Sequence, residues 1–399
     1  MSASAISARA RAVAASAWIG WGAVALAVLA AYLTLPPLLL RTPLPSLVLA
    51  AAAAVGGAVA VRGGQRRLGW AAVVVAGACG ALAVGATLSS VQNLERVVVW
   101  PALIAAMLRY ATPLVFAALG GVVSERAGVV NIGLEGMMLV GAFFAIFGAD
   151  VTQSWFGGLL VGMVAGGLLG LLHAVFAVSL RADQIVSGTA VNLLALGITG
   201  YVFLDYYGSE GTPSGIPQVP DVVLPIDWIP VVGEALSRLN LLVWLSLIGV
   251  AVTSVVLFRT PLGLRLRSVG ENPRAAETVG ISVYRTRYLA VVASGVLAAM
   301  GGAFLSIGFL NSFSQELTAG RGFIALAAVI FGRWKPGGAL AAALLFGFSS
   351  ALAQRLPVFS PSAATLFQAL PYVLTLIAVA GLIGRSTPPA ADGVPYTRG

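Results

Sequence analysis

Three short polar segments contain most of the side chains in this chain that could bind a ligand or do chemistry: residues 124–136, 271–281 and 318–336. The sequence has only one histidine, His173, and one cysteine, Cys79. It has no HExxH zinc motif, no nucleophile elbow and no Gly-Lys-Ser/Thr phosphate loop, each of which requires several groups at fixed spacing. We therefore expect no catalytic residue, no metal site and no cofactor bound by this chain, and we expect His173 to be a core residue with satisfied hydrogen bonds.

The first polar segment, residues 124–136, interrupts a long apolar stretch with Glu125, Arg126, Asn131 and Glu135. A carboxylate near the middle of a bilayer costs roughly 2.5–3.5 kcal/mol on insertion scales, so it normally faces protein or water. Three glycines in the same segment would allow a helix to break there. Two interpretations are open: a broken helix that lines a path through the protein, and an ordinary interfacial loop with a Glu125–Arg126 pair at the cytoplasmic surface. We predict the loop and its pair for Glu125 and Arg126, and the path for Glu135, which lies several residues deeper.

The second polar segment has the residues that begin and end a short helix. Asn272 can cap a helix N-terminus, and Pro273 suits the first helical position because its missing N–H would be unpaired there anyway. Gly280 can adopt the left-handed conformation that ends a helix. The surrounding loop, 259–287, contains six arginines and two glutamates, a net charge of +4 that favours the cytoplasmic side. We predict a helix from Pro273 to Val279 that contacts a soluble partner.

The third polar segment contains a short apolar helix with polar residues at both of its ends. Gly320, Arg321 and Gly322 stand at its start, where the positive end of the helix dipole could point toward a polar ligand. The basic and aromatic residues 333–335 at its other end are typical of an anchor at the membrane interface. A tight turn followed by packing glycines is the alternative interpretation.

The elements that position these segments are transmembrane helices. The chain has 399 residues, of which 59% are apolar and 9% charged, and its mean hydropathy is +0.96. A soluble protein of this size could not bury so much apolar surface, and the apolar runs are continuous rather than alternating, which excludes a transmembrane barrel. We expect an all-α fold, a polytopic transmembrane helical bundle. The net charge of +9 lies largely in short loops, so we expect no nucleic acid partner.

Runs of suitable length for a bilayer predict about twelve spans. The large loop 205–240 carries five acidic residues and one arginine, a net charge of −4, which favours the outside. Both termini are then cytoplasmic, and the short spans around 319–353 could instead be half-helices. The expected spans lie near 17–40, 45–61, 68–88, 100–123, 129–149, 156–180, 185–204, 241–258, 288–309, 319–332, 337–353 and 362–384.

The chain divides by composition into three parts. Residues 1–97 contain about three apolar spans with almost no polar group at membrane depth and form an N-terminal extension. Residues 98–385 contain about nine spans with glycine-rich helices and form the functional core. Residues 386–399 are rich in proline, alanine and glycine and predict a disordered cytoplasmic tail. An inverted repeat with broken helices would suit a transporter, although the short match between residues 141–143 and 302–304 does not establish one.

The run from Ser124 to Met138 resembles the signature near the start of nucleoside ABC importer permeases, and the runs 270–276 and 320–334 fit the same subfamily. The chain is thereby identified as a member of the binding-protein-dependent permease superfamily, which also serves branched-chain amino acids and ribose. The resemblance covers about residues 98–385. The three additional N-terminal spans depart from the compact family pattern.

The resemblance implies the permease subunit of an ATP-driven importer for nucleosides of the guanosine type, a multi-pass protein of the bacterial cell (inner) membrane. It implies three protein partners: a second permease, a cytoplasmic ABC ATPase that binds the ATP, and an extracytoplasmic substrate-binding lipoprotein. The residues expected to form the helix that couples to the ATPase are Glu271, Asn272, Pro273, Arg274, Ala275, Ala276, Glu277 and Gly280. The residues expected along the translocation path are Asn131, Gly133, Glu135, Gly320 and Arg321.

Three alternatives remain open at this stage. A permease for a sugar or a branched-chain amino acid would share the same superfamily. A secondary transporter driven by ions would need several carboxylates at membrane depth, and the core offers chiefly Glu135. A membrane-embedded enzyme would need a nucleophile, a metal set or an acid–base pair, none of which the sequence contains.

Overall fold

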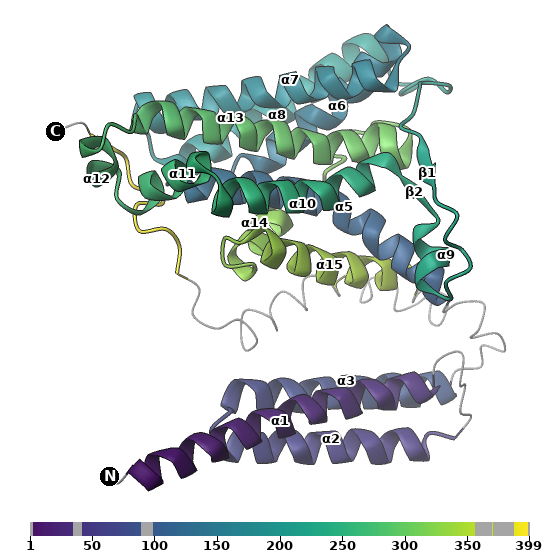
Figure 1. Cartoon of the computed structure of the whole chain (residues 1–399). Helices are drawn as coiled ribbons and strands as arrows, with labels where there is room; N and C mark the ends of the chain where they lie inside the picture. Colours follow the sequence, from purple (N-terminus) through teal and green to yellow (C-terminus); the bar gives the residue numbers. More distant parts are fainter. Residues whose placement is uncertain (1–2, 35–41, 89–98, 356–368, 370–386, 398–399) are drawn as a thin grey trace. The chain divides into compact units, whose positions relative to one another are not determined.

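The computed structural model describes residues 3–34, 42–88, 99–355, 369 and 387–397. The chain forms two compact units, residues 1–103 with 352–384 and residues 104–351 with 385–399. The expected all-α transmembrane bundle is confirmed in the described ranges, where helices are joined by loops and a single small sheet (Figure 1).

The elements of the first unit are α1 (Ala3–Thr34), α2 (Leu44–Arg62) and α3 (Arg66–Leu88). Those from α5 onward are α5 (Trp100–Arg126), α6 (Leu134–Thr152), α7 (Trp155–Ala174), the π-helix η1 (Val175–Ser179), α8 (Gln184–Tyr207), β1 (Asp221–Val223), α9 (Val232–Leu236), β2 (Arg238–Asn240), α10 (Leu241–Arg259), α11 (Pro261–Glu271), α12 (Pro273–Thr278), α13 (Val283–Ala303), the π-helix η2 (Phe304–Leu310), α14 (Arg321–Phe331) and α15 (Pro336–Ala353).

Nine helices in the described part of the chain are long and apolar enough to cross a membrane, which makes this a multi-pass membrane protein. Two further expected spans fall on α3, where the apolar stretch is Leu68–Ala81, and on the short apolar helix Arg321–Phe331. The expected span at 362–384 lies outside the described residues, which include only residue 369 of it. Each of the eleven expected spans that the structure describes therefore overlaps a helix.

Small residues hold α1, α2 and α3 together as a three-helix unit. Ala27, Ala53 and Ala76 form its buried centre, and Gly57 on α2 lies so close to α3 that an added Cβ would stand 2.8 Å from the Gly69 carbonyl oxygen. Close approach of backbones through small residues is the usual way that helices associate in lipid, where no hydrophobic force drives them together. The large side chains point outward instead, as the 79% exposure of Trp18 shows.

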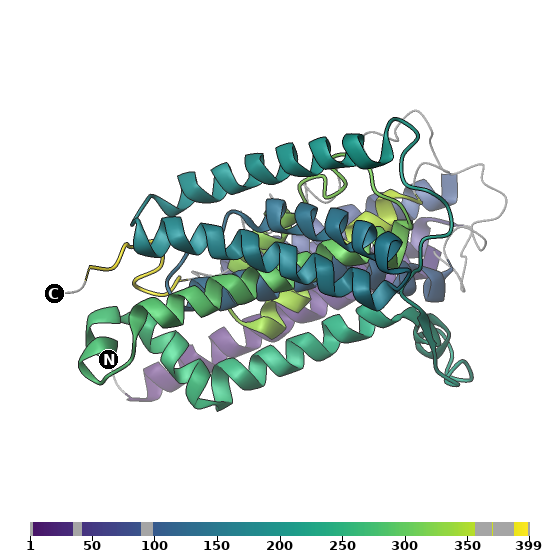
Figure 2. The same ribbon diagram turned by 90° about the horizontal axis from the view of Figure 1, so that it is seen from above.

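The core of the second unit is the packing of α6 against α7 and α13, again through glycines. A Cβ at Gly141 of α6 would stand 2.3 Å from the Ala299 Cα atom on α13, and one at Gly302 of α13 would stand 1.8 Å from the Met138 carbonyl oxygen on α6. The segments 141–143 and 302–304 therefore pack in the same helix interface. Seen from above, α8 lies at one edge of this unit and α10 at the opposite edge (Figure 2).

The helix α14 is too short to cross a bilayer. Its 11 residues extend over roughly 16 Å, against an apolar thickness of about 30 Å. Arg333 and Trp334, both with positive φ (55° and 53°), then reverse the chain into α15. The half-helix alternative is therefore the one that the structure adopts for this span.

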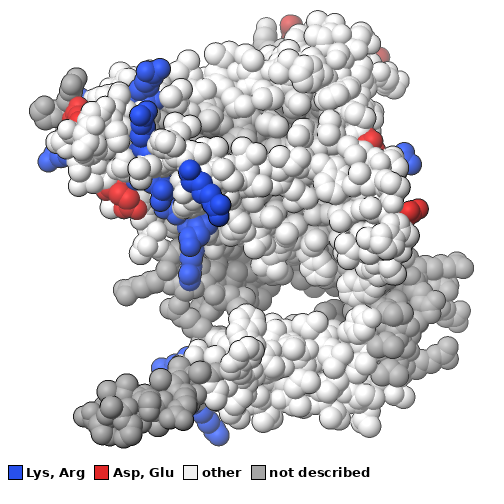
Figure 3. Space-filling view, in the orientation of Figure 1, with Lys and Arg blue, Asp and Glu red and all other residues white. Residues whose placement is uncertain are grey.

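Charge separates the two ends of the second unit, as predicted from the loops. Arginines gather where α10 ends and α11, α12 and α13 begin, which we call the basic end (Figure 3). The opposite end holds α9 and a small antiparallel sheet in which Asp221 pairs with Asn240 and Val223 with Arg238. The Arg238 guanidinium forms an ion pair with Asp221 there, at 3.3 Å.

Candidate functional site

Residues 127–133 form a break between α5 and α6. Backbone groups in this break form hydrogen bonds with side chains from other helices. The Val130 N–H donates to the Gln184 side-chain oxygen (2.7 Å), and the Val130 carbonyl oxygen lies 3.2 Å from His173 Nε2. The other ring nitrogen of His173 lies 2.9 Å from the Ser187 hydroxyl oxygen. Irregular backbone at membrane depth must find such partners within the protein. His173, which is fully buried, is thus a core residue with both nitrogens bonded, as the sequence predicts.

Asn131 and Gly133 lie inside this break. The fully buried Asn131 donates its amide N–H groups to the Ser294 hydroxyl (2.8 Å) and to the Met137 sulfur (3.4 Å). Gly133 is the residue that precedes α6, and a Cβ added to Gly188 of α8 would stand 2.9 Å from its nitrogen. Both residues therefore stabilise the broken helix in this structure rather than face open space.

Asn192 on α8 also holds the break, and sequence reasoning missed it. Its side-chain oxygen accepts from the Gly136 N–H (2.8 Å), and its amide donates to the Ile132 carbonyl oxygen (3.0 Å). Ser294 is a second such residue, on α13. The only indication in the sequence was a polar side chain within an apolar span, which does not identify its partner.

The Glu135 carboxylate binds the N-terminal end of the half-helix α14. One of its oxygens accepts from the Thr318 hydroxyl (2.6 Å) and the Gly320 N–H (2.8 Å), and the other accepts from the Gly322 N–H (2.5 Å). A carboxylate at this place satisfies N–H groups that have no partner within the helix and interacts favourably with the helix dipole. Residues of two segments that the sequence singled out separately are therefore brought together.

The N-terminal end of α14 contacts the protein itself. The sequence left open whether this end points toward a polar ligand or is a tight turn followed by packing glycines, and in the structure its partner is the Glu135 side chain. Gly320 has a left-handed conformation (φ 80°), which turns the chain into the helix without the cost that a side chain would add. The Arg321 guanidinium folds back to donate to the carbonyl oxygens of Leu317 and Thr318, each at 3.1 Å.

Glu125 and Arg126 hold the turn between α14 and α15 instead of pairing with each other. The Trp334 indole N–H donates to the Glu125 carboxylate, and Arg126 Nε donates to the Trp334 carbonyl oxygen (2.9 Å). Glu125 is 3% exposed and Trp334 is 5% exposed. The predicted pair between Glu125 and Arg126 is therefore wrong. Of the three residues predicted to form an interfacial anchor, Trp334 is buried, whereas Arg333 and Lys335 are exposed. Glu125 and Arg126 instead bond to a residue some 200 positions away along the chain.

The short helix α12 stands at the basic end, and Arg274, Ala275 and Thr278 on it are exposed (Figure 1). The predicted cap is present, since the Asn272 side-chain oxygen accepts from the Ala275 N–H (3.1 Å). Gly280 has the expected left-handed conformation, with φ 83°. Ala276 alone is buried, against Val269 and Val283. One side of the helix therefore packs against the protein through Ala276, and the other side is exposed.

The residues 387–397 are held against α11 and α12, which differs from the disorder that their composition predicts. The Ala391 N–H donates to the Gly270 carbonyl oxygen (2.9 Å), and the Ala390 N–H donates to the Glu271 carboxylate (3.2 Å). We call this segment the C-terminal strap. Composition describes what a segment can bury by itself, whereas the strap gains its order from the helices beneath it.

The strap also holds the second carboxylate of the α12 region. The Tyr396 hydroxyl donates to the Glu277 carboxylate, and the Tyr396 ring, 5% exposed, packs edge-on against Tyr284 at 5.7 Å. The Val394 carbonyl oxygen accepts from Arg287 Nη1 (3.0 Å). Glu277, which we expected to contact the ATPase, is thus bonded to the strap.

Asp392 is the one acidic residue of the strap, and it is partly withdrawn from water. Burial raises the pKa of its carboxyl group from 3.8 to about 7, while Arg287 and the Gly393 N–H act in the opposite direction. One of its oxygens is buried without a hydrogen-bond partner among the described residues. Protonation of Asp392 therefore favours the docked strap.

Comparisons with known proteins identify the family and several relatives of this chain. The model of the family described as "Branched-chain amino acid transport system / permease component" matches residues 103–379. The guanosine ABC transporter permease protein NupQ of Bacillus subtilis is 43% identical over 311 residues, which cover 74% of this chain and 97% of that protein. The nucleoside ABC transporter permease protein NupC of Lactococcus lactis is 42% identical over 307 residues, or 74% and 96% of the two chains.

A third relative has another named substrate. The putative glucose ABC transporter permease protein TsgC13 of Haloferax volcanii is 40% identical over 258 residues, which cover 63% of this chain and 77% of that protein. No solved structure matches the chain.

Proposed function

Because the chain belongs to the family of branched-chain amino acid transport system permease components, we propose that it is the transmembrane permease subunit of an ATP-driven importer for nucleosides. It is a membrane transport component and not an enzyme. We infer the coupling to ATP hydrolysis from helix α12, which is capped and exposed at the basic end. The basic charge of that end favours the cytoplasmic side, where a soluble ATPase is available.

The names and the aligned lengths of the relatives favour a nucleoside as the substrate. The two permeases named for guanosine or nucleosides align over 97% and 96% of their own length, against 77% for the one named for glucose. A sugar is therefore the alternative. Much of the selectivity would reside in an extracytoplasmic lipoprotein that delivers the substrate.

The surface offered to the ATPase would be the open side of α12. Arg274, Ala275 and Thr278 are exposed, and Val279, which follows the helix, is 74% exposed. Ala276 on the other side is anchored in the protein. A helix anchored in this way would move as a rigid piece when the ATPase moves, because its cap and its buried alanine prevent it from unwinding.

Motion of α12 would reach the translocation path through α11. Gly270 at the end of α11 lies against α5, since an added Cβ would stand 2.2 Å from the Arg126 carbonyl oxygen. The break at 127–133 begins directly after Arg126, and Glu135 then connects α6 to the half-helix α14. Contacts this close transmit a displacement because neither backbone can yield without separating the helices. We assign the broken helix and α14 to the gate of the path.

Three partners complete the importer: an ABC ATPase, a second permease and the substrate-binding lipoprotein. The membrane would be the bacterial cell membrane, with the basic end and both termini in the cytoplasm. Asn131, Gly133, Glu135, Gly320 and Arg321 would belong to the gate rather than to a preformed substrate site, because each is bonded or packed within the bundle.

The test is uptake of labelled guanosine, ribose and leucine by cells that express this chain with the three partner subunits. Ala275→Arg places a bulky charge on the open side of α12, and Asn272→Ala removes the cap, whereas Asn272→Ser retains it. We expect guanosine uptake that is lost with Ala275→Arg, reduced with Asn272→Ala and preserved with Asn272→Ser, with the protein present in the membrane in each case.

The two parts of the proposal fail differently in this experiment. Uptake of ribose or leucine in place of guanosine, with the same response to the α12 variants, would overturn the substrate and keep the coupling. Guanosine uptake that is unchanged by Ala275→Arg, with the ATPase still copurifying, would overturn the coupling and keep the substrate.

A further inference from the structure

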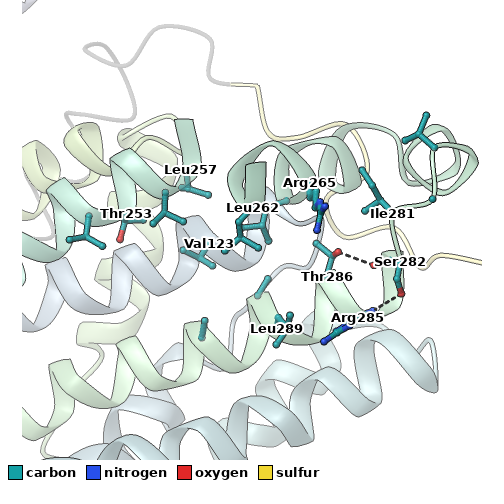
Figure 4. Close-up of a pocket in the computed structure, with 17 residues that line it drawn as sticks. Val123, Thr253, Leu257, Leu262, Arg265, Ile281, Ser282, Arg285, Thr286 and Leu289 are labelled. Atoms are coloured by element: carbon teal, nitrogen blue, oxygen red, sulfur yellow. Dashed lines mark hydrogen bonds between the residues drawn. The ribbon is translucent and has the colours of Figure 1, made fainter. Parts of the chain in front are cut away.

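A cavity of about 890 Å³ opens between α10, α11 and α13 near the basic end (Figure 4). Its walls are mainly apolar, with Val252, Val256, Leu262, Leu289 and Ala293 among the lining residues. Its volume lies in the range of sites for small molecules, roughly 300–1,000 Å³. Neither Asn131 nor Glu135 lines it, so the cavity is distinct from the gate described above.

The apolar part of this cavity faces the surroundings of the bundle. Val252 is 54% exposed, Leu262 is 52% exposed and Leu289 is 56% exposed. Val252 and Leu289 lie on α10 and α13, which are both long and apolar enough to cross a membrane. In a bilayer such side chains face acyl chains or another apolar surface, because water is absent there.

The end of the cavity toward α12 is basic. Arg265 of α11 and Arg285 of α13 both line it and are both exposed (Figure 4). Neither has a carboxylate partner among the described residues, where the ion pair is that of Arg238 with Asp221 at the opposite end of the unit. The nearby Thr286 hydroxyl is already used, since it donates to the Ser282 carbonyl oxygen (2.8 Å). The two guanidinium groups are therefore the donors available to an anion.

The structure assigns this cavity to an anionic phospholipid from the leaflet at the basic end. Two guanidinium groups at the rim match a phosphate, because their fixed N–H donors suit its oxygens. The apolar walls below them match the acyl chain that follows the phosphate in a lipid. A soluble phosphate compound would leave the apolar part empty, and a neutral lipid would leave the arginines without a partner.

A lipid in this place would act on the coupling elements. The cavity is lined by α11 and by residues 279–282, which flank α12 on both sides. Bound lipid would brace α11 against α10 and α13, so that the position of α12 depends on the charge of the surrounding membrane. This consequence rests on the proposed coupling role of α12, whereas lipid binding itself does not.

The test measures retained lipid directly. The full-length chain, alone and with its partner subunits, is extracted from vesicles of equal phosphatidylglycerol and phosphatidylcholine, and bound lipid is counted by native mass spectrometry. Arg265→Gln with Arg285→Gln removes the rim charge, and Arg259→Gln with Arg333→Gln removes the same charge from exposed arginines that do not line the cavity. Ala293→Phe fills the cavity without changing any charge.

Ala251→Phe is the control for added volume, since Ala251 is exposed on α10 and does not line the cavity. We expect the wild-type chain to retain phosphatidylglycerol over phosphatidylcholine by roughly tenfold or more, as two basic groups near a phosphate would give. The preference disappears in the Arg265/Arg285 variant, and total retained lipid falls with Ala293→Phe. Both control variants keep the wild-type values.

Three results would overturn the proposal. Equal retention of the two lipids by the wild-type chain would show that Arg265 and Arg285 do not select an anionic lipid. An equal loss in the Arg259/Arg333 control would assign the preference to the general charge of the protein. The assembled importer could also retain no lipid, and Ala293→Phe could cause loss of the second permease. These two results together would identify the cavity as a subunit interface.

Discussion

Replacing Glu135 with glutamine tests how the half-helix α14 is held in the bundle. In the structure its two carboxylate oxygens accept three hydrogen bonds from residues 318–322. Glutamine keeps the shape of the side chain and one acceptor oxygen. Its NH₂ group, however, must face at least one donor, because every contact made by the carboxylate is to an N–H or an O–H group.

The magnitude follows from these three bonds. A hydrogen bond to a charged group contributes about 1.5–3 kcal/mol and one to a neutral group about 0.5–1.5 kcal/mol, so two retained bonds lose roughly 2 kcal/mol together. The third donor is left buried without a partner, which costs about 1–3 kcal/mol. We therefore expect Glu135→Gln to lower the free energy of unfolding by about 3–5 kcal/mol, a large part of the about 5–15 kcal/mol that is typical of folded proteins.

The assay is equilibrium unfolding of the purified chain in mixed micelles, together with nucleoside uptake by the assembled importer. Thr318→Val removes only the hydroxyl donor and should cost about 1.5–3 kcal/mol, the value for a hydrogen bond to a charged group. Because both substitutions affect one contact, their combined effect should be smaller than the sum of the two. A Glu135→Gln protein that unfolds within about 0.5 kcal/mol of the wild type, as ordinary surface variants do, would refute the reasoning.

A matched pair of glycines tests the same contact through packing alone. A Cβ at Gly322 would stand 2.5 Å from both the Cα and the nitrogen atoms of Glu135, so Gly322→Ala must push α14 away from α6. Gly337, at the start of α15, has no atom within 4 Å of an added Cβ. We expect Gly322→Ala to cost about 1–3 kcal/mol and Gly337→Ala to be neutral or slightly stabilising. Equal effects would mean that α14 does not pack on α6 in this way.

Three further predictions concern the core and the strap. Gly302→Ala should destabilise the chain by about 1–3 kcal/mol in thermal unfolding, because its Cβ would stand 1.8 Å from the Met138 carbonyl oxygen; an unchanged midpoint would contradict it. Tyr396→Phe removes the hydroxyl that donates to Glu277 and should cost about 1–3 kcal/mol of strap docking, seen as faster proteolysis near the C-terminus; an unchanged rate would exclude this role. The pKa of Asp392 rises from 3.8 when the group is free to about 7 in the docked strap, so its contribution to docking is full below about pH 4 and is lost as the pH rises through 7. Hydrogen exchange in the strap, corrected for its intrinsic rate, should then be slower at about pH 6 than at about pH 8, and Asp392→Asn should remove the difference.

The features that the sequence alone determined depend on residues that lie close together along the chain. Apolar runs of bilayer length predict the helices, and the loop charges predict which end of the bundle is basic. The short helix α12 could be placed almost to the residue, because Asn272, Pro273 and Gly280 act on the backbone within one turn of themselves. The family resemblance likewise rests on contiguous runs of residues.

What the tertiary structure decided are contacts between segments far apart in the chain. Glu135 finds its donors more than 180 residues away, and Glu125 bonds to Trp334 rather than to its neighbour Arg126. The strap is ordered by α11 and α12, although its composition predicts disorder. A sequence shows that a polar side chain within a membrane needs a partner, but only the packing of the helices determines which partner comes within reach.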